Sequence, residues 1–217
     1  MARISAVDPK DAGLLARLAF RFGPRMMAKQ TGNFPDGGLE PMAVMAHQPK
    51  LFNAYMRLEG VTSKLDSLPE RLQHLTQLRA ATMVECEYCI DIGSQVARRS
   101  GMSDEELLGL ADHRGCGLFS ELEMLVLDYV TALSRTPLEV SDELVTALRA
   151  ELSDAQIVEL THLAAIENYR GRVNHSLGIG AAGFSEGMVC ALPVDHASAG
   201  HAVASGGPSP HASSAAG

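Results

Sequence analysis

Apolar residues recur at three- and four-residue steps along most of the chain, the spacing that places them on one face of an α-helix. Leu68, Leu72, Leu75 and Leu78 follow this spacing, and so does the run from Phe119 to Leu133. No stretch keeps the two-residue alternation of a half-buried strand. The pattern predicts an all-α fold, with helices at about 10–22, 39–60, 68–82, 84–99, 104–113, 120–134, 141–150 and 154–177.

Capping residues mark several of the expected helix starts. In a capping box a hydroxyl accepts from the backbone N–H three residues later, and a carboxylate or amide there accepts in return. Three pairs have this spacing, and Ser141 is suited to a simple N-cap. The pairs are Ser103 with Glu106, Ser120 with Glu123, and Ser153 with Gln156.

Composition shifts set the expected domain limits. Residues 23–38 contain two prolines and four glycines, which predicts a loop in the later half of this run, after a short first helix. Beyond Pro193 the chain is rich in Ala, Ser, Gly and His and has almost nothing to bury. We therefore expect one all-α domain over residues 1–194 and a flexible tail over 195–217.

Charge and hydropathy exclude several classes of partner. The 217 residues are 46% hydrophobic, and 18 basic against 26 acidic residues give a formal net charge of −8. This balance opposes broad affinity for nucleic acid or anionic membrane surfaces. No apolar run has the length of a spanning helix, and the first residues lack the pattern of a secretory signal. The sequence predicts a cytoplasmic protein.

The candidate chemistry lies in Cys86-Glu-Tyr-Cys89. A three-residue step at the start of a helix puts both sulfurs on one side, close enough to bridge. Backbone N–H groups of a first helical turn lower a thiol pKa and favour the reactive thiolate. The acidic residues Glu85, Glu87 and Asp91 act in the opposite direction. Thiol–disulfide cycling is therefore possible.

Two other interpretations of the pair stay open. Cys86 and Cys89 would serve equally as small buried hydrophobic residues. Alternatively, His113 and Cys116 would complete a Cys₃His zinc site with them, at spacings that a structural zinc site tolerates.

Several segments together resemble the carboxymuconolactone decarboxylase superfamily, specifically its alkylhydroperoxidase D-like branch. The likeness spans about residues 40–185 and rests on the order and spacing of its motifs. These are Leu75-Thr-Gln-Leu-Arg-Ala-Ala, the CxxC pair, Ala97-x-x-x-Gly101-Met-Ser-Asp-Glu-Glu106, Ser153-Asp-Ala-Gln-Ile-Val-Glu-Leu-Thr161 and Asn168-x-x-x-Arg172-x-Asn174-x-x-Leu-Gly178.

The resemblance implies an all-helical fold that associates into homo-oligomers, trimers or hexamers. It also implies a thiol peroxidase in which Cys89 attacks the hydroperoxide, the sulfenic acid condenses with Cys86, and a dithiol reductant regenerates the pair. No cofactor and no metal are expected in this reaction.

The chain departs from the branch at two positions. The branch has a glutamate twelve residues before the first cysteine and a histidine four after the second, where this chain has His74 and Gly93. The proton relay is therefore absent as written. His74 is our candidate for a replacement base, because a neutral imidazole titrates near physiological pH. Asp91 is expected to point away from the sulfurs and to cap or pair elsewhere.

Two further functions remain as alternatives. A non-redox lyase, decarboxylase or isomerase acting on a small carboxylated metabolite would need a cationic pocket and would not need the cysteines. A non-catalytic helical assembly protein would have packed sulfurs and no pocket. The residues available for a cationic pocket are Arg79, Arg170, Arg172, His74 and His162.

Overall fold

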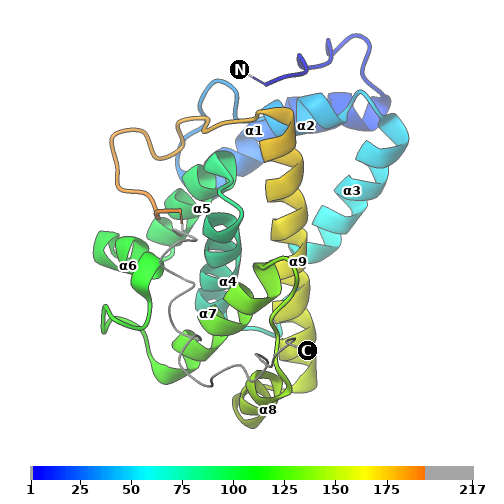
Figure 1. Ribbon diagram of the computed structural model, residues 1–217. Helices are drawn as coiled ribbons and strands as arrows, with labels where there is room; N and C mark the ends of the chain where they lie inside the picture. Colours follow the sequence, from blue (N-terminus) through cyan, green and yellow to red (C-terminus); the bar gives the residue numbers. More distant parts are fainter. Residues whose placement is uncertain (1, 194–217) are drawn as a thin grey trace, which may run out of the picture.

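The protein is an all-α molecule in the computed structural model, which describes residues 2–193 (Figure 1). The predicted tail at 195–217 lies outside the described residues, so the single-domain limits stay a prediction. The helices are α1 (Leu14–Thr31), α2 (Glu40–Met45), α3 (Pro49–Thr62), α4 (Glu70–Met83), α5 (Glu87–Arg99), α6 (Asp104–Gly109) with a 3₁₀ turn at Leu110–Asp112, α7 (Glu121–Ser134), α8 (Asp142–Glu151) and α9 (Asp154–Leu177).

Helix α4 is the centre of the bundle and packs against α5, α7 and α9. Every residue from Leu78 to Met83 is buried, so this half of α4 has no solvent-facing side. Arg79 is buried here too, and its guanidinium donates to Thr131 Oγ1 (2.8 Å) and the Leu110 carbonyl (2.7 Å). Such partners are required, because an unsatisfied charge in this core would be strongly destabilising.

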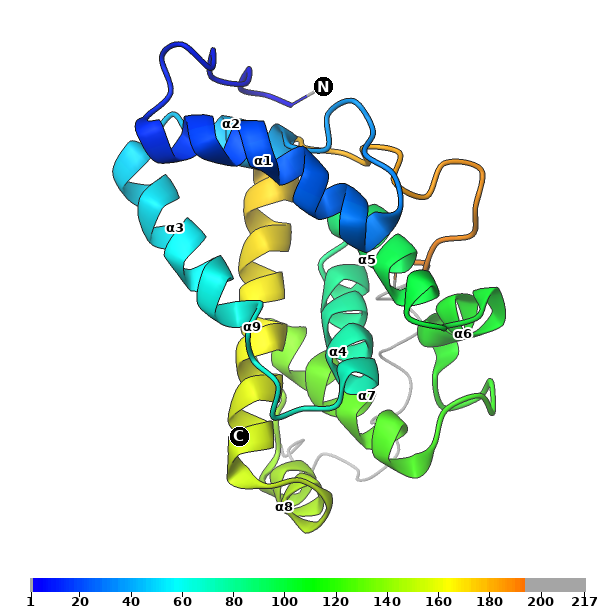
Figure 2. The ribbon, with the colours of Figure 1, turned by 180° about the vertical axis from the view of Figure 1, so that it is seen from behind.

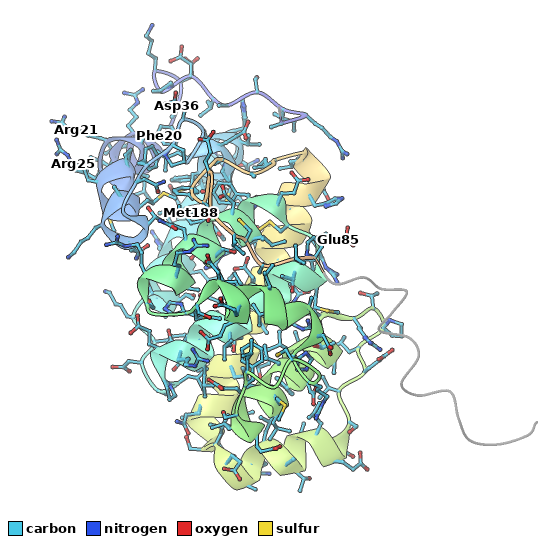
Figure 3. All side chains as sticks on the ribbon, turned by 90° about the vertical axis from the view of Figure 1, so that its left-hand side faces the viewer. Phe20, Arg21, Arg25, Asp36, Glu85 and Met188 are labelled. Atoms are coloured by element: carbon cyan, nitrogen blue, oxygen red, sulfur yellow. A yellow bond between two sulfur atoms is a disulfide. The ribbon has the colours of Figure 1, made fainter. Side chains whose placement is uncertain are left out.

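Helices α1, α2 and α3 form a second layer, and α3 slants away from the rest of the body (Figure 2). A small cluster of Ala12, Ala16, Ala46 and Phe52 holds this layer together. Arg170 of α9 bridges to α3 through an ion pair with Glu59 and also pairs with Glu167 at 2.7 Å. On the outer side, Arg21 and Arg25 project from α1 away from the bundle (Figure 3).

The four helix starts predicted from capping residues are confirmed. All three capping boxes form with both reciprocal bonds, at Ser103, Ser120 and Ser153. Ser141 accepts from the Leu144 N–H at 3.2 Å and caps α8. These ends depend on residues only three apart, which is why the sequence specifies them.

Two predicted helices were wrong in extent. The first helix does not end near 22 but continues through Pro24 to Thr31. Tertiary contacts hold this extension: Thr31 is buried, and its carbonyl accepts from Gln95 Nε2 (2.8 Å). The predicted 39–60 helix is split, because Pro49 begins α3 and disfavours helical backbone at Gln48, which has φ −117° and ψ 87°.

Asp91 fastens the segment after α9 onto α5. The chain leaves α9 at Gly178 and returns along α5, and the Asp91 carboxylate accepts four consecutive backbone N–H groups there. As predicted, Asp91 is therefore engaged away from the sulfurs. The four donors are Ala182 (2.9 Å), Gly183 (2.7 Å), Phe184 (3.0 Å) and Ser185 (2.7 Å). Within residues 2–193 no helix has both the length and the apolar character to cross a membrane.

Candidate functional site

A sharp turn between α4 and α5 places the cysteine pair. Glu85 has a left-handed φ of 52°, the conformation that usually calls for glycine. The Cys86 N–H donates to the Ala81 carbonyl (3.1 Å) and the Glu85 N–H to that of Thr82 (3.4 Å), which is the double bond of a Schellman motif. The turn ends α4 and leaves Cys86 as the N-cap of α5.

The sulfurs of Cys86 and Cys89 are joined in a disulfide, with Cα atoms 5.2 Å apart. The Cys89 N–H points at Cys86 Sγ (3.3 Å) as its capping bond. Both residues are buried, Cys86 with 1% and Cys89 with 6% of its surface exposed. The structure therefore brings two of the three predicted site residues together at a helix start, where N–H groups favour negative charge on sulfur.

Helix α9 covers the pair with residues that the sequence analysis did not single out for this role. The Asn174 Nδ2 lies 3.6 Å from Cys89 Sγ and 3.7 Å from Cys86 Sγ, within reach of both. One turn earlier, Gly171 lets the helix backbone approach: a Cβ there would be 3.3 Å from the Cys86 Cβ and would collide with Val84. The only sequence signal was the shared helical face of Gly171 and Asn174.

The structure does not bring His74 to the sulfurs. Its Nε2 lies 2.9 Å from Ser100 Oγ and 3.4 Å from Glu70 Oε1. Ser100 caps the opposite end of α5, about 16 Å along the helix axis from Cys89 at 1.5 Å per residue. The geometry thus gives His74 no route to act as a base for the pair.

Position 93, where the alkylhydroperoxidase D-like branch has its relay histidine, is a glycine in this chain. Gly93 lies one turn after Cys89, and a Cβ there would be 2.8 Å from Leu78 Cδ1. The volume that a histidine would need at this position is filled by a buried leucine.

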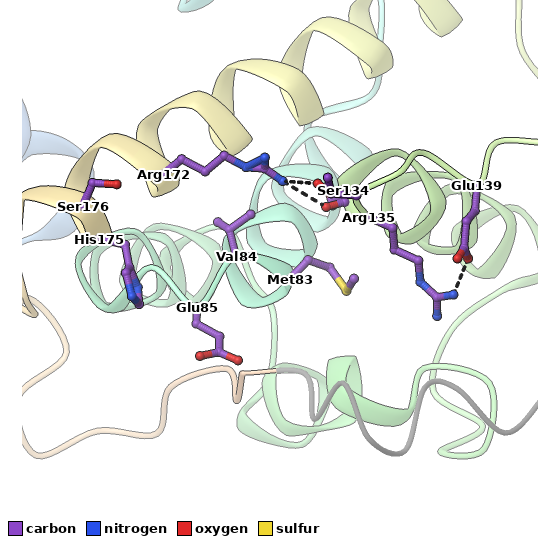
Figure 4. Close-up of a pocket in the computed structure, with 10 residues that line it drawn as sticks. Met83, Val84, Glu85, Ser134, Arg135, Glu139, Arg172, His175 and Ser176 are labelled. Atoms are coloured by element: carbon purple, nitrogen blue, oxygen red, sulfur yellow. Dashed lines mark hydrogen bonds and ion pairs between the residues drawn. The ribbon is translucent and has the colours of Figure 1, made fainter.

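A pocket of about 590 Å³ opens at the α4–α5 turn that leads into Cys86 (Figure 4). Neither sulfur lines it, and Val84, which does, lies with Cys86 against Gly171 of α9. Of the two features expected for a non-catalytic assembly protein, the packed sulfurs are present, but a pocket is present as well. Its lining comes from the α4–α5 turn, the end of α7 and α9, and consists of Met83, Val84, Glu85, Ser134, Arg135, Thr136, Glu139, Arg172, His175 and Ser176.

Of the arginines and histidines named for a cationic pocket, only Arg172 lines it. Arg79 is bound in the core, and Arg170 joins α9 to α3. His162 Nε2 lies 2.8 Å from Thr62 Oγ1, also in the α3–α9 contact. The second arginine of the pocket is Arg135, which the sequence analysis did not name.

The zinc interpretation is not supported by the arrangement of its ligands. His113 Nε2 lies 2.8 Å from Asp128 Oδ1, and the Cys116 thiol donates to the His113 carbonyl. In the part of the chain that the structure describes, no three residues of the His, Cys, Asp or Glu type gather as metal ligands. Cys86 and Cys89 are instead bonded to each other.

Comparison with known proteins places this helical arrangement in a family. The model of the carboxymuconolactone decarboxylase family matches residues 49–132. An uncharacterized protein of Escherichia coli (strain K12), YnjA, is 40% identical over 137 residues, which cover 63% of this chain and 70% of that protein. The chain belongs to the carboxymuconolactone decarboxylase family. The match includes α3, α4, α5 and most of α7, and therefore the cysteine pair.

Solved structures agree with this carboxymuconolactone decarboxylase family assignment and with an AhpD-like fold. A protein of unknown function from Agrobacterium tumefaciens, described as a putative antioxidant defence protein AhpD, superposes with a TM-score of 0.57 at 27% identity, over 62% of this chain and 92% of that one. The debrominase Bmp8 superposes with a TM-score of 0.67 at 19% identity, over 82% and 91% of the two chains. The second likeness is one of fold.

Proposed function

We propose that this protein is a thiol-dependent oxidoreductase in which Cys86 and Cys89 alternate between dithiol and disulfide, with a hydroperoxide as oxidant. The observation that carries the proposal is the disulfide at the N-terminus of α5. Two cysteines three residues apart at a helix start combine a lowered thiol pKa with a partner close enough to bridge. Asn174 adds a hydrogen-bond donor to both sulfurs.

The reaction runs in two half-cycles. The Cys89 thiolate attacks the terminal oxygen of the hydroperoxide, the O–O bond breaks, and the alcohol leaves after taking a proton. The Cys86 thiol then attacks the sulfenic acid sulfur, the disulfide forms and water leaves. An external dithiol reduces the disulfide by exchange and is itself oxidised. We assign the attack to Cys89 because it is the more exposed of the two and because it matches the second cysteine of the AhpD-like motif.

The chain replaces the proton relay of the branch with fixed hydrogen-bond donors. The imidazole at the first relay position, His74, contacts Ser100 at the far end of α5, and the second relay position is Gly93, so neither position supplies a base at the sulfurs. The helix N-terminus and the Asn174 amide stabilise a thiolate without accepting its proton. We therefore propose slow turnover, limited by thiol deprotonation. The required dithiol reductant fits a reducing compartment, and we propose the cytoplasm.

Free-thiol counting tests the proposal. The reduced chain has four thiols, and one equivalent of cumene hydroperoxide should remove those of Cys86 and Cys89. Cys89→Ser should consume no peroxide, and Cys86→Ser should stop at a sulfenic acid that dimedone traps. Cys116→Ser and Cys190→Ser, which replace the two free cysteines, are the matched controls and should behave as the unmodified protein. The proposal would be contradicted if the unmodified protein lost no thiols, or if Cys86→Ser and Cys89→Ser consumed peroxide as fast as the unmodified protein. Running the same count with 2,3,4-tribromopyrrole tests a carbon–bromine bond as the alternative oxidant.

A second candidate function is a non-redox lyase of the decarboxylase type. The observation in its favour is the pocket that contains Arg135 and Arg172. The cysteine variants distinguish the two candidates. A lyase activity on a carboxylated metabolite would be retained in Cys86→Ser and Cys89→Ser, whereas the oxidoreductase activity would be lost.

We also propose that the protein is a homo-oligomer that uses the outer face of α1. Four large apolar side chains lie there at four-residue steps: Leu14, Leu18, Phe22 and Met26, which are 77%, 44%, 46% and 69% exposed. Such a stripe is typical of an interface. Helix α1 contains four basic and no acidic residues, so we propose that it meets an acidic surface of a second copy rather than the second copy's own α1.

Sedimentation tests this interface. The double variant Leu18→Glu/Phe22→Glu should lower the sedimenting mass, while Val158→Glu, which replaces a more exposed apolar residue of α9, should not. A mass of one chain for the unmodified protein would contradict the oligomer, and an unchanged oligomer in the double variant would contradict this face.

A further inference from the structure

The pocket at the α4–α5 turn contains one arginine that has no ionic partner. The Arg172 guanidinium makes two contacts, both to neutral oxygens: the Ser134 carbonyl at 3.4 Å and Thr136 Oγ1 at 3.2 Å (Figure 4). Over residues 2–193 no carboxylate lies within ion-pair distance of it. By contrast, Arg135 in the same pocket is paired with Glu139. Arg172 therefore retains donors for a ligand.

The position of Arg172 is supported by buried polar groups. Ser134 is only 4% exposed, and its hydroxyl accepts from Asn168 Nδ2 at 2.8 Å. Asn168 lies one turn before Arg172 on α9, so one face of the helix presents both the arginine and the residue that orders its neighbour. His175 follows on the same face and lines the pocket, and its ring has no hydrogen-bond partner among the described residues.

We propose that this pocket binds a small organic monocarboxylate, held by Arg172 with His175 as a second donor. A guanidinium presents two parallel N–H groups that match a carboxylate, and this geometry gives both affinity and orientation. A volume of about 590 Å³ lies in the range of ligand pockets. Glu85 and Glu139 also line the pocket, so a second carboxylate on the ligand would meet negative charge.

The pocket and the disulfide share one wall. Val84 lines the pocket and also packs on Gly171, whose backbone lies against Cys86. If the proposed oxidoreductase function holds, on which this step rests, the monocarboxylate is the substrate: an organic hydroperoxide with a carboxylate at Arg172 and its O–O group directed at the Val84 wall. Because Cys86 and Cys89 are only 1% and 6% exposed, the turn at Val84 would have to move for the peroxide to reach the sulfurs.

A binding experiment tests the site without any turnover. The probes are 2-naphthoate and its uncharged analogue 2-naphthamide, followed by ligand fluorescence anisotropy on the Cys86→Ser/Cys89→Ser protein. The carboxylate should bind at least tenfold more tightly than the amide, and Arg172→Gln should remove that difference. Arg149→Gln replaces an exposed arginine of α8 and should not change it. Equal binding of both probes, or a difference that survives in Arg172→Gln, would overturn the proposal.

A kinetic comparison separates this proposal from the proposed function. With linoleic acid hydroperoxide, Arg172→Gln should raise KM at least tenfold with little change in kcat, and with the methyl ester of that hydroperoxide it should change neither. Failure of the protein to reduce any hydroperoxide would reject the oxidoreductase and leave the naphthoate result to decide the binding site. Reduction of acid and ester with equal KM would reject the carboxylate site alone.

Discussion

The Leu78 side chain fills the space next to Gly93, where a Cβ would lie 2.8 Å from Leu78 Cδ1. Glycine inside a helix is ordinarily less favourable than alanine by about 1 kcal/mol. At Gly93 this gain is outweighed by overpacking, which costs about 1–3 kcal/mol. Packing of the core against Leu78 therefore favours glycine at position 93, one turn after Cys89.

We therefore expect Gly93→Ala to lower the free energy of unfolding by about 1 kcal/mol, from the balance of these two effects. Gly60 offers a matched control, because it also lies in a helix and a Cβ added to it would have no neighbouring atom within 4 Å. Gly60→Ala should raise the stability by about 0.5–1 kcal/mol. Urea unfolding of both variants measures the two changes in stability. An equal increase in both would show that the Leu78 side chain repacks around the added Cβ without cost.

Replacing Asn174 by Asp should raise the pKa of the reactive thiol. The substitution removes a donor 3.6 Å from Cys89 Sγ and introduces a carboxylate in its place. Nearby negative charge disfavours a thiolate, and we expect a shift of about one unit or more. The measurement is the pH dependence of iodoacetamide alkylation of the reduced Cys116→Ser/Cys190→Ser protein.

Two variants serve as controls for Asn174→Asp. Asn174→Ala removes the donor without adding charge and should shift the pKa in the same direction by less. Asn53→Asp adds the same charge at an exposed position of α3 and should leave the alkylation profile unchanged. An unchanged profile in Asn174→Asp would mean that the amide does not stabilise the thiolate.

Glu85→Gly should stabilise the protein. A left-handed φ costs a residue with a Cβ about 1 kcal/mol or more, and glycine does not incur this penalty. Glu85→Ala keeps the unfavourable φ and removes the carboxylate, so the difference between the two variants isolates the backbone contribution. Thermal unfolding should rank Gly above Ala by about 1 kcal/mol. Equal stability of the two variants would show that residue 85 leaves the left-handed conformation once the glutamate side chain is removed.

The pH dependence of stability should differ in sign between two buried glutamates. Burial raises the pKa of Glu167, and Arg170 only partly opposes it. Burial also acts to raise the pKa of Glu123, but hydrogen bonds from Ser120 and Arg71 outweigh it and the pKa is lowered. An unfolded glutamate titrates at about 4.3. Wild-type stability thus falls at Glu167 as the pH rises above that value, and falls at Glu123 as the pH drops below it.

The test compares Glu167→Gln and Glu123→Gln with the unmodified protein by urea unfolding between about pH 3 and pH 7, a range that spans the unfolded value. Glu167→Gln should become more stable relative to the unmodified protein as the pH rises. Glu123→Gln should become less stable relative to it over the same range. Parallel curves for the two variants would contradict the assigned directions.

The sequence predicted those parts of the fold that depend on near neighbours in the chain. The capping boxes at Ser103, Ser120 and Ser153 form because both partners lie within four residues. The extent of α1 was not predictable, because its passage through Pro24 relies on contacts that Thr31 makes with α5. Local chemistry sets where a helix begins, and packing decides how far it continues.

The candidate site divides in the same way. Cys86 and Cys89 could be paired from their spacing, because three residues of helix fix their relative position. Asn174 and Arg172 follow more than 80 residues later, and no local pattern links them to the cysteines. His74 was proposed as a base only because of its position in the motif. That position does not predict where the side chain lies, and the structure places it against Ser100, at the end of α5 away from the cysteines.

In the proposed thiol–disulfide cycle, the two nearly equal distances from Asn174 to the sulfurs affect which cysteine carries the negative charge. One amide can follow the negative charge from sulfur to sulfur without moving its own helix, so it favours neither as nucleophile. The choice is left to whichever sulfur an incoming molecule meets first. Under the proposed cycle, a substitution that changes access to one sulfur would therefore alter the order of attack, whereas a substitution of Asn174 would alter the charge on both sulfurs.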